Sequence, residues 1–204
     1  MFLDAGCRFF GTPFLSMGKN RYDLISSLRP SLALAGFLWL EEVIDQLGVY
    51  PFDTLGIIPR NLVGLRGILF APLLHANFAH LIANTVPLIL LLTLLGADPK
   101  NRPSAALSWI WFLSGLGTWL IGRDGSVHIG ASSVIFGVAS FLIVAGWMAR
   151  SWRSILVSAI VLFAFGGIFY GVLPQKGRIS WEGHLSGAIS GIWAARRLVK
   201  GGAS

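Results

Sequence analysis

Six long apolar runs dominate the chain, and short polar stretches separate them. Each run holds about 17 residues or more, enough for an α-helix to cross the hydrocarbon core of a bilayer. The first run carries Glu41, Glu42 and Asp45 in its second half. We expect these acids at the outer interface, because a charge in mid-bilayer is costly. The pattern predicts an all-α polytopic membrane protein with a six-helix bundle, the spans covering about residues 30–48, 71–95, 105–121, 132–149, 154–173 and 180–198.

The segments outside these runs differ in character. Residues 49–70 contain glycines and prolines among apolar residues, which breaks the run too often for a span. This composition predicts an interfacial or re-entrant segment. Residues 1–29 are mixed in polarity and predict a cytoplasmic tail with no cleaved signal peptide. The predicted organisation is therefore this tail, a six-span domain over residues 30–199, and a short cytoplasmic tail over 200–204.

Composition supports the membrane assignment. Of 204 residues, 54% are hydrophobic and only 12% are charged, and the mean hydropathy is +0.71. A soluble domain carries roughly twice that share of charged residues, about 25%. The single cysteine, Cys7, excludes an intramolecular disulfide and argues against a cysteine-ligated zinc site. We expect no metal and no cofactor.

The net charge of +7 raises the possibility of nucleic-acid binding, but the distribution of basic residues explains it better. With six spans, both termini lie on one side, and eleven of the sixteen Lys and Arg residues fall on that side. Basic residues concentrate in cytoplasmic loops. The bias predicts that both termini are cytoplasmic and that nucleic acid is no partner. It also places the loop before Ser132 in the outer half of the bilayer.

Candidate chemistry begins at Ser132, where a glycine-rich loop runs into the fourth apolar run. One interpretation is that Ser132 or Ser133 caps the helix, a favoured role for serine. The other is that Ser132 is a nucleophile, because free N–H groups and the positive end of the helix dipole would stabilise an oxyanion there. The small residues Gly130 and Ala131 would let a substrate carbonyl approach.

Three of the four histidines, His75, His80 and His184, fall inside predicted spans, where ionisable residues are candidates for function. A hydrogen bond between helices would explain any one of them. His80 and Asn84 are four residues apart and share a helix face.

His184 shares a face of the sixth run with the small residues Gly187 and Gly191, which form a G-x-x-x-G pattern. This pattern allows two helices to pack closely. Close packing on the fourth span would bring the His184 imidazole within reach of Ser132.

Taken together, these motifs resemble the rhomboid family of intramembrane serine proteases over roughly residues 30–199. The resemblance rests on the order and spacing of H-x4-H-x3-N in the second span, G-x-S in the fourth and G-H-x-x-G in the sixth. It implies that Ser132 is the nucleophile and His184 the general base of a dyad. It further implies that His80 and Asn84, with the Ser132 N–H, form the oxyanion hole.

The same resemblance implies supporting roles for five further residues and a place for the protein in the cell. Phe136 would pack on the base in place of the family's usual aromatic residue, and the remaining supporting residues are His75, Gly130, Gly187 and Gly191. The expected partners are the transmembrane segments of substrate proteins and the lipid bilayer, and the expected location is a bacterial inner membrane.

The sequence departs from the family pattern at two places. Ser133 stands where the family usually has glycine after the nucleophile, and the family's frequent Trp-Arg pair in the first outer loop is missing, with Arg66 as a partial replacement. Two other functions remain open. The chain could be a catalytically inactive rhomboid-like binding protein, although it has both the serine and the histidine. A histidine-lined metal or proton transporter is disfavoured by the lack of an intramembrane ligand cluster such as H-E-x-x-H.

Overall fold

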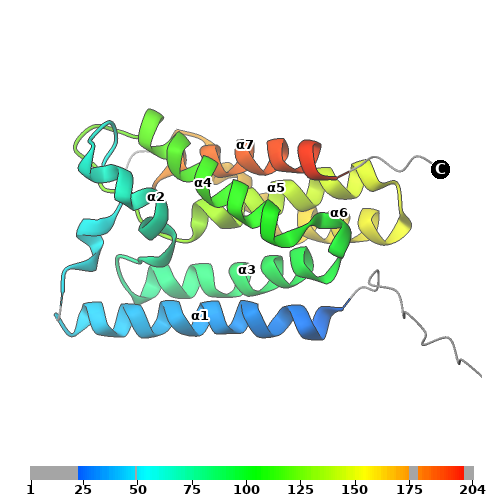
Figure 1. Ribbon diagram of the computed structural model, residues 1–204, viewed down its shortest axis with the longest axis horizontal. Coiled ribbons are helices and arrows are strands. Elements are labelled where there is room, and N and C mark those ends of the chain that lie inside the picture. The colour runs from blue at the N-terminus through cyan, green and yellow to red at the C-terminus, as the bar shows by residue number, and fades with distance from the viewer. Residues whose placement is uncertain (1–22, 49, 175–178, 200–204) are drawn as a thin grey trace, which may run out of the picture.

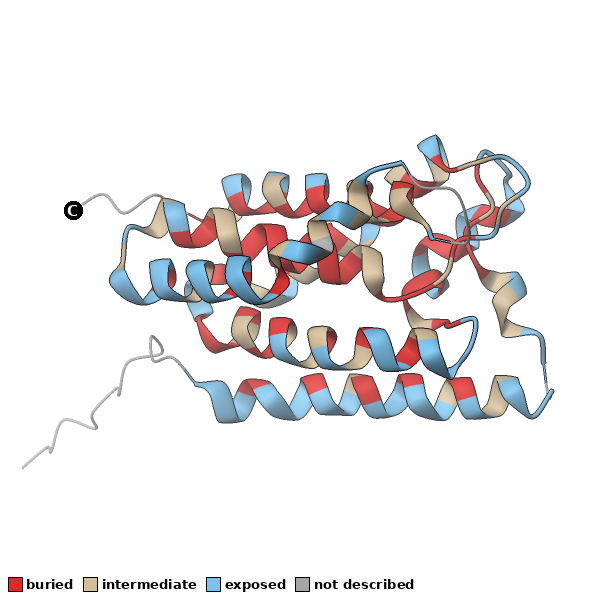
Figure 2. Cartoon of the chain, turned by 180° about the vertical axis from the view of Figure 1, so that it is seen from behind, coloured by how far each residue is buried: buried red, intermediate tan, exposed pale blue. Residues whose placement is uncertain are grey.

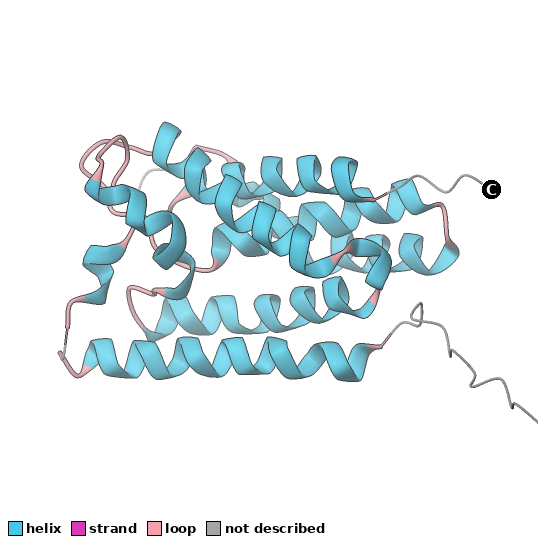
Figure 3. Ribbon diagram, viewed as in Figure 1, coloured by secondary structure: helices cyan, strands magenta, loops and turns pink. Residues whose placement is uncertain are grey.

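The computed structural model describes residues 23–48, 50–174 and 179–199 of the chain. These residues form an all-α bundle with no strand among them, as the apolar runs predict (Figure 3). The long helices are α1 (Leu24–Gln46), α3 (Phe78–Ala97), α4 (Pro103–Ile121), α5 (Ser132–Ala149), α6 (Trp152–Phe165) and α7 (Trp181–Leu198). Shorter elements join them: η1 (Phe52–Leu55), η2 (Val63–Arg66), α2 (Gly67–Phe70), η3 (Ala71–Leu73), η4 (Pro99–Asn101) and η5 (Gly166–Val172).

Helix α5 occupies the centre of the bundle. It contacts α3, α4, α6 and α7, while α1 packs along α3 at the edge (Figure 1). Eleven of its 18 residues are buried, whereas the outer helices expose most of their side chains on one face (Figure 2). A helix that is apolar all round is buried by its neighbours. The apolar run that begins at Ser132 is therefore the core of the molecule.

Three helices, α3, α4 and α5, are long and apolar enough by themselves to cross a membrane, and α6 is a shorter apolar helix. The predicted all-α bundle is thus confirmed, with six long helices among the described residues. Length and composition support a membrane span for three of them, and the other three spans stay a prediction. The fifth predicted span divides at Gly166, where the α-helix gives way to the 3-10 turns of η5.

The ends of two helices differ from the sequence prediction because side chains cap them. Helix α1 begins at Leu24, ahead of the predicted residue 30, since the Asp23 carboxylate accepts a hydrogen bond from the Ser26 N–H at 3.0 Å. Helix α3 begins only at Phe78, since Asn77 accepts from the His80 N–H at 2.9 Å. These are N-cap interactions of the favoured kind. The prediction that His75 lies inside a span is therefore wrong, and it belongs to the connection before α3.

Two acids are buried within the protein: Glu42, which is expected at the interface, and Glu182. Glu42 accepts a hydrogen bond from Gln46 at 2.9 Å in the packed face of α1. Glu182, in the first turn of α7, is 0% exposed and pairs with Arg123 at 2.8 Å. A charge in such a place is tolerated only when hydrogen bonds or an opposite charge compensate it.

Residues 50–70, the described part of the segment 49–70 that is predicted to be interfacial or re-entrant, form a folded connector beside α4. The Arg60 guanidinium donates to the carbonyl oxygens of Leu120 and Gly122, both at 2.8 Å, and pairs with Asp124. Arg66 donates to the Thr54 carbonyl at 2.9 Å within the same segment. Residues 1–22 of the predicted tail 1–29, with Cys7, lie outside the described residues, as do the predicted tail 200–204 and the loop residues 175–178.

Candidate active site

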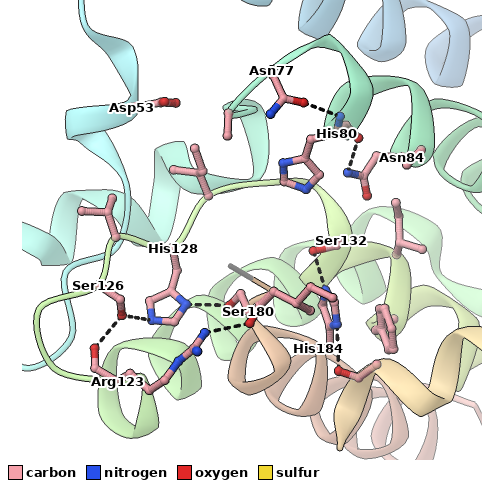
Figure 4. Close-up of a pocket in the computed structure, with 18 of the residues that line it drawn as sticks. Asp53, Asn77, His80, Asn84, Arg123, Ser126, His128, Ser132, Ser180 and His184 are labelled. Atoms are coloured by element: carbon pink, nitrogen blue, oxygen red, sulfur yellow. Dashed lines mark hydrogen bonds between the residues drawn. The ribbon is translucent and has the colours of Figure 1, made fainter. Parts of the chain in front are cut away.

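Ser132 is the first residue of α5, and it does not cap the helix. The capping position belongs to Ala131, whose side chain makes no cap hydrogen bond. The Ser132 hydroxyl instead lies 2.9 Å from Nε2 of His184, which comes from α7 (Figure 4). The interpretation of Ser132 as an ordinary N-cap is therefore wrong. Its hydroxyl is directed at an imidazole 52 residues away in the chain.

The surroundings of His184 select one tautomer. Nδ1 lies 3.0 Å from the carbonyl oxygen of Gly171, at the end of η5. A carbonyl oxygen only accepts hydrogen bonds, so Nδ1 carries the proton. Nε2 is then an unprotonated acceptor facing the Ser132 hydroxyl. Such an arrangement can take a proton from the serine, which is how a general base activates a nucleophile.

An aromatic ring holds the imidazole in this plane. Phe136, one helical turn after Ser132, stacks on His184 with 4.2 Å between ring centroids and 7° between planes. Phe169 of η5 packs edge-on against Phe136 at 5.9 Å. The structure thus places Phe136 where the resemblance expects an aromatic residue. The stack restricts rotation of the His184 ring.

Small residues set the spacing of α5 and α7. A Cβ atom added at Gly187 would overlap the Ser133 carbonyl oxygen, and one added at Gly191 would overlap the Gly137 carbonyl oxygen. Both glycines therefore sit against the α5 backbone, as the G-x-x-x-G pattern predicts. This close approach allows the short serine side chain to reach His184.

The opposite wall of the site comes from the connection before α3 and from its first turns. The rings of His75 and His80 meet edge-to-face at 5.1 Å, and Nε2 of His75 accepts from the Ala131 N–H at 3.5 Å. Asn84 donates from its amide to the His80 carbonyl oxygen at 2.9 Å, so its side chain is held by its own helix. His75 thus supports the loop before Ser132.

Gly130 brings this wall to the start of α5. Its φ is +117°, a conformation that glycine adopts easily because it has no side chain. An added Cβ would lie 2.6 Å from His80 Cε1. The Gly130 N–H donates to the Ala71 carbonyl oxygen at 2.8 Å. The loop can therefore pass directly beside the His80 ring and deliver Ser132 next to it.

A cavity of about 1080 Å³ joins the two walls. Figure 4 shows Ser132 between His184 on one side and the His80 and Asn84 side chains on the other. All four residues line the cavity, so the structure brings together the serine, the histidine and both predicted donors. Among the described residues, no group of three or more His, Cys, Asp or Glu side chains is arranged to hold a metal ion.

Some residues of the site were not predicted from the sequence. Asn77 caps α3, and the capping pattern before an apolar run is the signal that could have found it. His128, the fourth histidine, contacts Ser126 and Ser180 through its two ring nitrogens (Figure 4). Gly171 contributes only a carbonyl oxygen, which leaves no mark in the sequence.

Comparison with known proteins identifies a matching family model and several related sequences. A family model described as Rhomboid domain matches residues 64–201. An uncharacterized protein of Mycobacterium tuberculosis is 48% identical over 175 residues, which cover 82% of this chain and 73% of the relative. A second uncharacterized protein, from Mycobacterium leprae, is 44% identical over 176 residues, covering 82% of this chain and 69% of the relative.

A more distant relative carries the family's name. Rhomboid-like protein 11, chloroplastic, of Arabidopsis thaliana is 24% identical over 217 residues, covering 91% of this chain and 73% of the relative. No solved structure matches the chain significantly. With the domain match spanning most of the helical bundle and α-helices that can cross a membrane, the chain belongs to the rhomboid family of membrane proteins.

Proposed function

We propose that this protein is an intramembrane serine endopeptidase that cleaves transmembrane segments of other membrane proteins. One observation carries the proposal: the Ser132 hydroxyl lies 2.9 Å from Nε2 of His184, whose other nitrogen faces the Gly171 carbonyl oxygen. A structural hydrogen bond between helices would not require a fixed tautomer, a stacked ring and an adjoining cavity together.

In the proposed reaction, Ser132 Oγ attacks the carbonyl carbon of the scissile peptide bond while its proton passes to His184 Nε2. The carbonyl oxygen becomes an oxyanion, and the Ser132 N–H and the side chains of His80 and Asn84 donate hydrogen bonds to it. His184 then gives the proton to the leaving amine as the C–N bond breaks. A water molecule then attacks the acyl carbonyl carbon and gives a proton to His184. The bond between the acyl carbon and Ser132 Oγ breaks, His184 returns the proton to Ser132 Oγ, and the carboxylic acid product leaves.

The Asn84 amide has to turn toward the oxyanion, because it donates to the His80 carbonyl oxygen in the resting structure. Hydrogen bonds to developing charge are often poorly aligned before substrate binds. The arrangement supports this step, since Asn84 lines the same cavity as Ser132.

Orientation and location form part of the proposal. The bias of basic residues favours cytoplasmic termini in a bacterial inner membrane, which puts the start of α5 in the outer half of the bilayer. Cleavage should then occur near the outer end of the substrate helix.

The test compares the purified protein with Ser132→Ala and Ser133→Ala in detergent. A fluorophosphonate probe should label the wild type and Ser133→Ala but not Ser132→Ala, and the same two proteins should cut a single-span test substrate. Labelling that persists in Ser132→Ala and disappears in Ser133→Ala would reassign the nucleophile. A folded wild type that neither labels nor cleaves would favour the inactive rhomboid-like binding protein instead.

A further inference from the structure

His128 lies outside the Ser132–His184 pair, in the loop between α4 and α5. Its backbone forms an isolated antiparallel bridge with Ile57, with both N–H to carbonyl hydrogen bonds at 2.9 Å. The residue is only 4% exposed. The backbone bridge ties the loop to the segment after η1 and leaves the ring to contact other partners.

The hydrogen bonds around the His128 ring run in one direction. The Ser126 hydroxyl donates to the Arg123 carbonyl oxygen at 2.6 Å, so toward His128 it accepts, and Nε2 at 2.8 Å must donate. Nδ1 is then an acceptor, and it takes the proton of the Ser180 hydroxyl at 2.6 Å. Ser180 Oγ in turn accepts from the Gly183 N–H at 3.3 Å. Every donor and acceptor is satisfied with a neutral ring.

This hydrogen-bond chain connects the two segments that carry Ser132 and His184. Ser180 caps α7, and His184 follows it by four residues in the first turn of that helix. His128 precedes Ser132 by four residues in the loop that enters α5. Figure 4 shows the ring between its two serines, and all three residues line the cavity that holds the pair. A shift at either end of the chain would move one reacting side chain relative to the other.

Burial favours the neutral ring of His128, whereas the two charged groups that face it act in opposite directions. Arg123, in the same loop, and Glu182, in α7, form an ion pair at 2.8 Å that bridges the same two segments. Burial has the largest effect and lowers the pKa of His128; Glu182 raises this pKa, and Arg123 lowers it by less than Glu182 raises it. A protonated ring would present an N–H at Nδ1. The Ser180 hydroxyl, which donates to Nδ1 when the ring is neutral, would then have to accept from it, and its own proton would lose its acceptor.

We propose that His128 is a positioning residue: through Ser180 it holds the start of α7 against the loop before α5 and so keeps Ser132 and His184 at reacting distance. The inference rests on the proposed function insofar as these two side chains are the reacting pair. Its structural content, the coupling of the two segments, can be measured without any activity.

Three substitutions at His128 separate the two ends of the chain. Asparagine places an acceptor oxygen close to the position of Nδ1 and keeps the bond to Ser180. Glutamine reaches instead toward the position of Nε2 and keeps the bond to Ser126, and phenylalanine keeps neither. His128→Asn should retain most of the wild-type kcat, whereas His128→Gln, His128→Phe and Ser180→Ala should lose about 10- to 100-fold, because a displacement of about 1 Å can have such an effect. KM should change little.

Ser151→Ala is the matched control, because Ser151 caps α6 as Ser180 caps α7 but has no link to His128. It should leave kcat unchanged. An equal loss of kcat in Ser151→Ala and Ser180→Ala would show that the loss comes from removing a helix cap, and would overturn the proposal. Equal kcat values in His128→Phe and the wild type would also overturn the proposal.

A second readout is the ¹⁵N resonance of His184 Nε2 in detergent, with Ser132→Ala marking its position when the serine contact is lost. In His128→Phe and Ser180→Ala the resonance should move toward that position, and in His128→Asn it should not. A resonance unmoved in His128→Phe refutes the positioning role whatever the activity. A wild type that shows the Ser132 contact but cleaves nothing refutes the proposed function, while the resonances of the variants still decide the role of His128.

Discussion

The carbonyl oxygen of Gly171 decides which nitrogen of His184 is free to act as a base. It accepts from Nδ1 at 3.0 Å, and Nε2 is left facing Ser132. No side chain is involved in this selection, so no substitution in η5 removes it directly. At the scale of single residues, the site is therefore best probed through the side chains that hold the ring and complete the opposite wall.

The Phe136 ring stacked on His184 gives the first prediction. Phe136→Leu should lower kcat by about 3- to 10-fold, since contacts between aromatic rings contribute about 0.5–1.5 kcal/mol. The control is Phe141→Leu, which removes the same ring from the apolar core of the same helix. Steady-state kinetics in detergent would measure both. A loss as large in Phe141→Leu would assign the effect to packing and not to the base.

The second prediction concerns His80 and Asn84. His80→Ala or Asn84→Ala should lower kcat by about 10²–10³, the usual effect of removing one oxyanion donor, with a smaller effect on thermal stability. Asn101→Ala is the control for Asn84, because Asn101 also donates from its amide to a backbone carbonyl oxygen, that of Leu95, at 3.3 Å. Unchanged rates in both His80→Ala and Asn84→Ala would remove these residues from the oxyanion hole.

The third prediction concerns the buried, neutral His128 and the pH dependence of stability. Its pKa is lowered in the folded protein, mainly by burial, so the unfolded chain binds a proton at a higher pH than the folded one. Its contribution to stability is thus complete above the usual histidine pKa of about 6.5 and declines as the pH falls below it. The midpoint of thermal unfolding should fall more steeply below this pH in the wild type than in His128→Asn. Parallel curves would contradict the prediction.

At the scale of elements, the contact between α5 and α7 governs the site. Apolar runs predict where helices are, but side-chain caps and glycines decide where they begin and how closely they pack. Helix α7 could not approach α5 to this distance with any residue larger than glycine at 187 or 191. The Ser132–His184 contact depends on that approach.

Substitution at this contact gives the fourth prediction. Gly187→Ala should destabilise the protein by about 1–3 kcal/mol, the range for overpacking a close contact, and should abolish most activity. Gly36→Ala on α1 is the control, because a Cβ there meets nothing within 4 Å. That change should be neutral or stabilise by about 0.4–1 kcal/mol. Thermal unfolding with both variants would measure the difference, and equal midpoints would show that α7 can withdraw from α5 without cost.

At the scale of the whole molecule, the site lies where several elements meet at one end of the bundle. The cavity is lined by residues from α3, α5, α7 and the loop between α4 and α5. A substrate helix that reaches Ser132 has its own peptide groups hydrogen-bonded within the segment. It must unwind locally before a peptide carbonyl can face the serine.

This requirement gives the fifth prediction. Replacing glycine or proline near the cut by leucine should slow cleavage, because these residues lower the cost of unwinding by about 1 kcal/mol for glycine and about 3 kcal/mol for proline. Mass spectrometry of the products would locate the cut near the outer end of the substrate helix. Cuts at the cytoplasmic end would contradict the orientation, and rates indifferent to the replacement would contradict the need for unwinding.

The sequence by itself determined the fold class and the candidate residues of the site. Apolar runs long enough to cross a bilayer specify helices, because lipid offers the backbone no hydrogen-bond partners. Two local patterns can be recognised from the sequence alone: the spacing of His80 and Asn84, and the glycines that follow His184. Together with the resemblance to the rhomboid family, these patterns selected Ser132 and His184 as candidates from the sequence.

Only the tertiary structure decided the rest. The tautomer of His184, the pairing of buried Glu182 with Arg123 and the position of His128 between two serines depend on partners far apart in sequence. A carbonyl oxygen is present in every residue, and a serine beside a histidine in space need not be beside it in the chain. Such contacts arise when helices pack, because packing brings together groups whose spacing along the chain carries no signal.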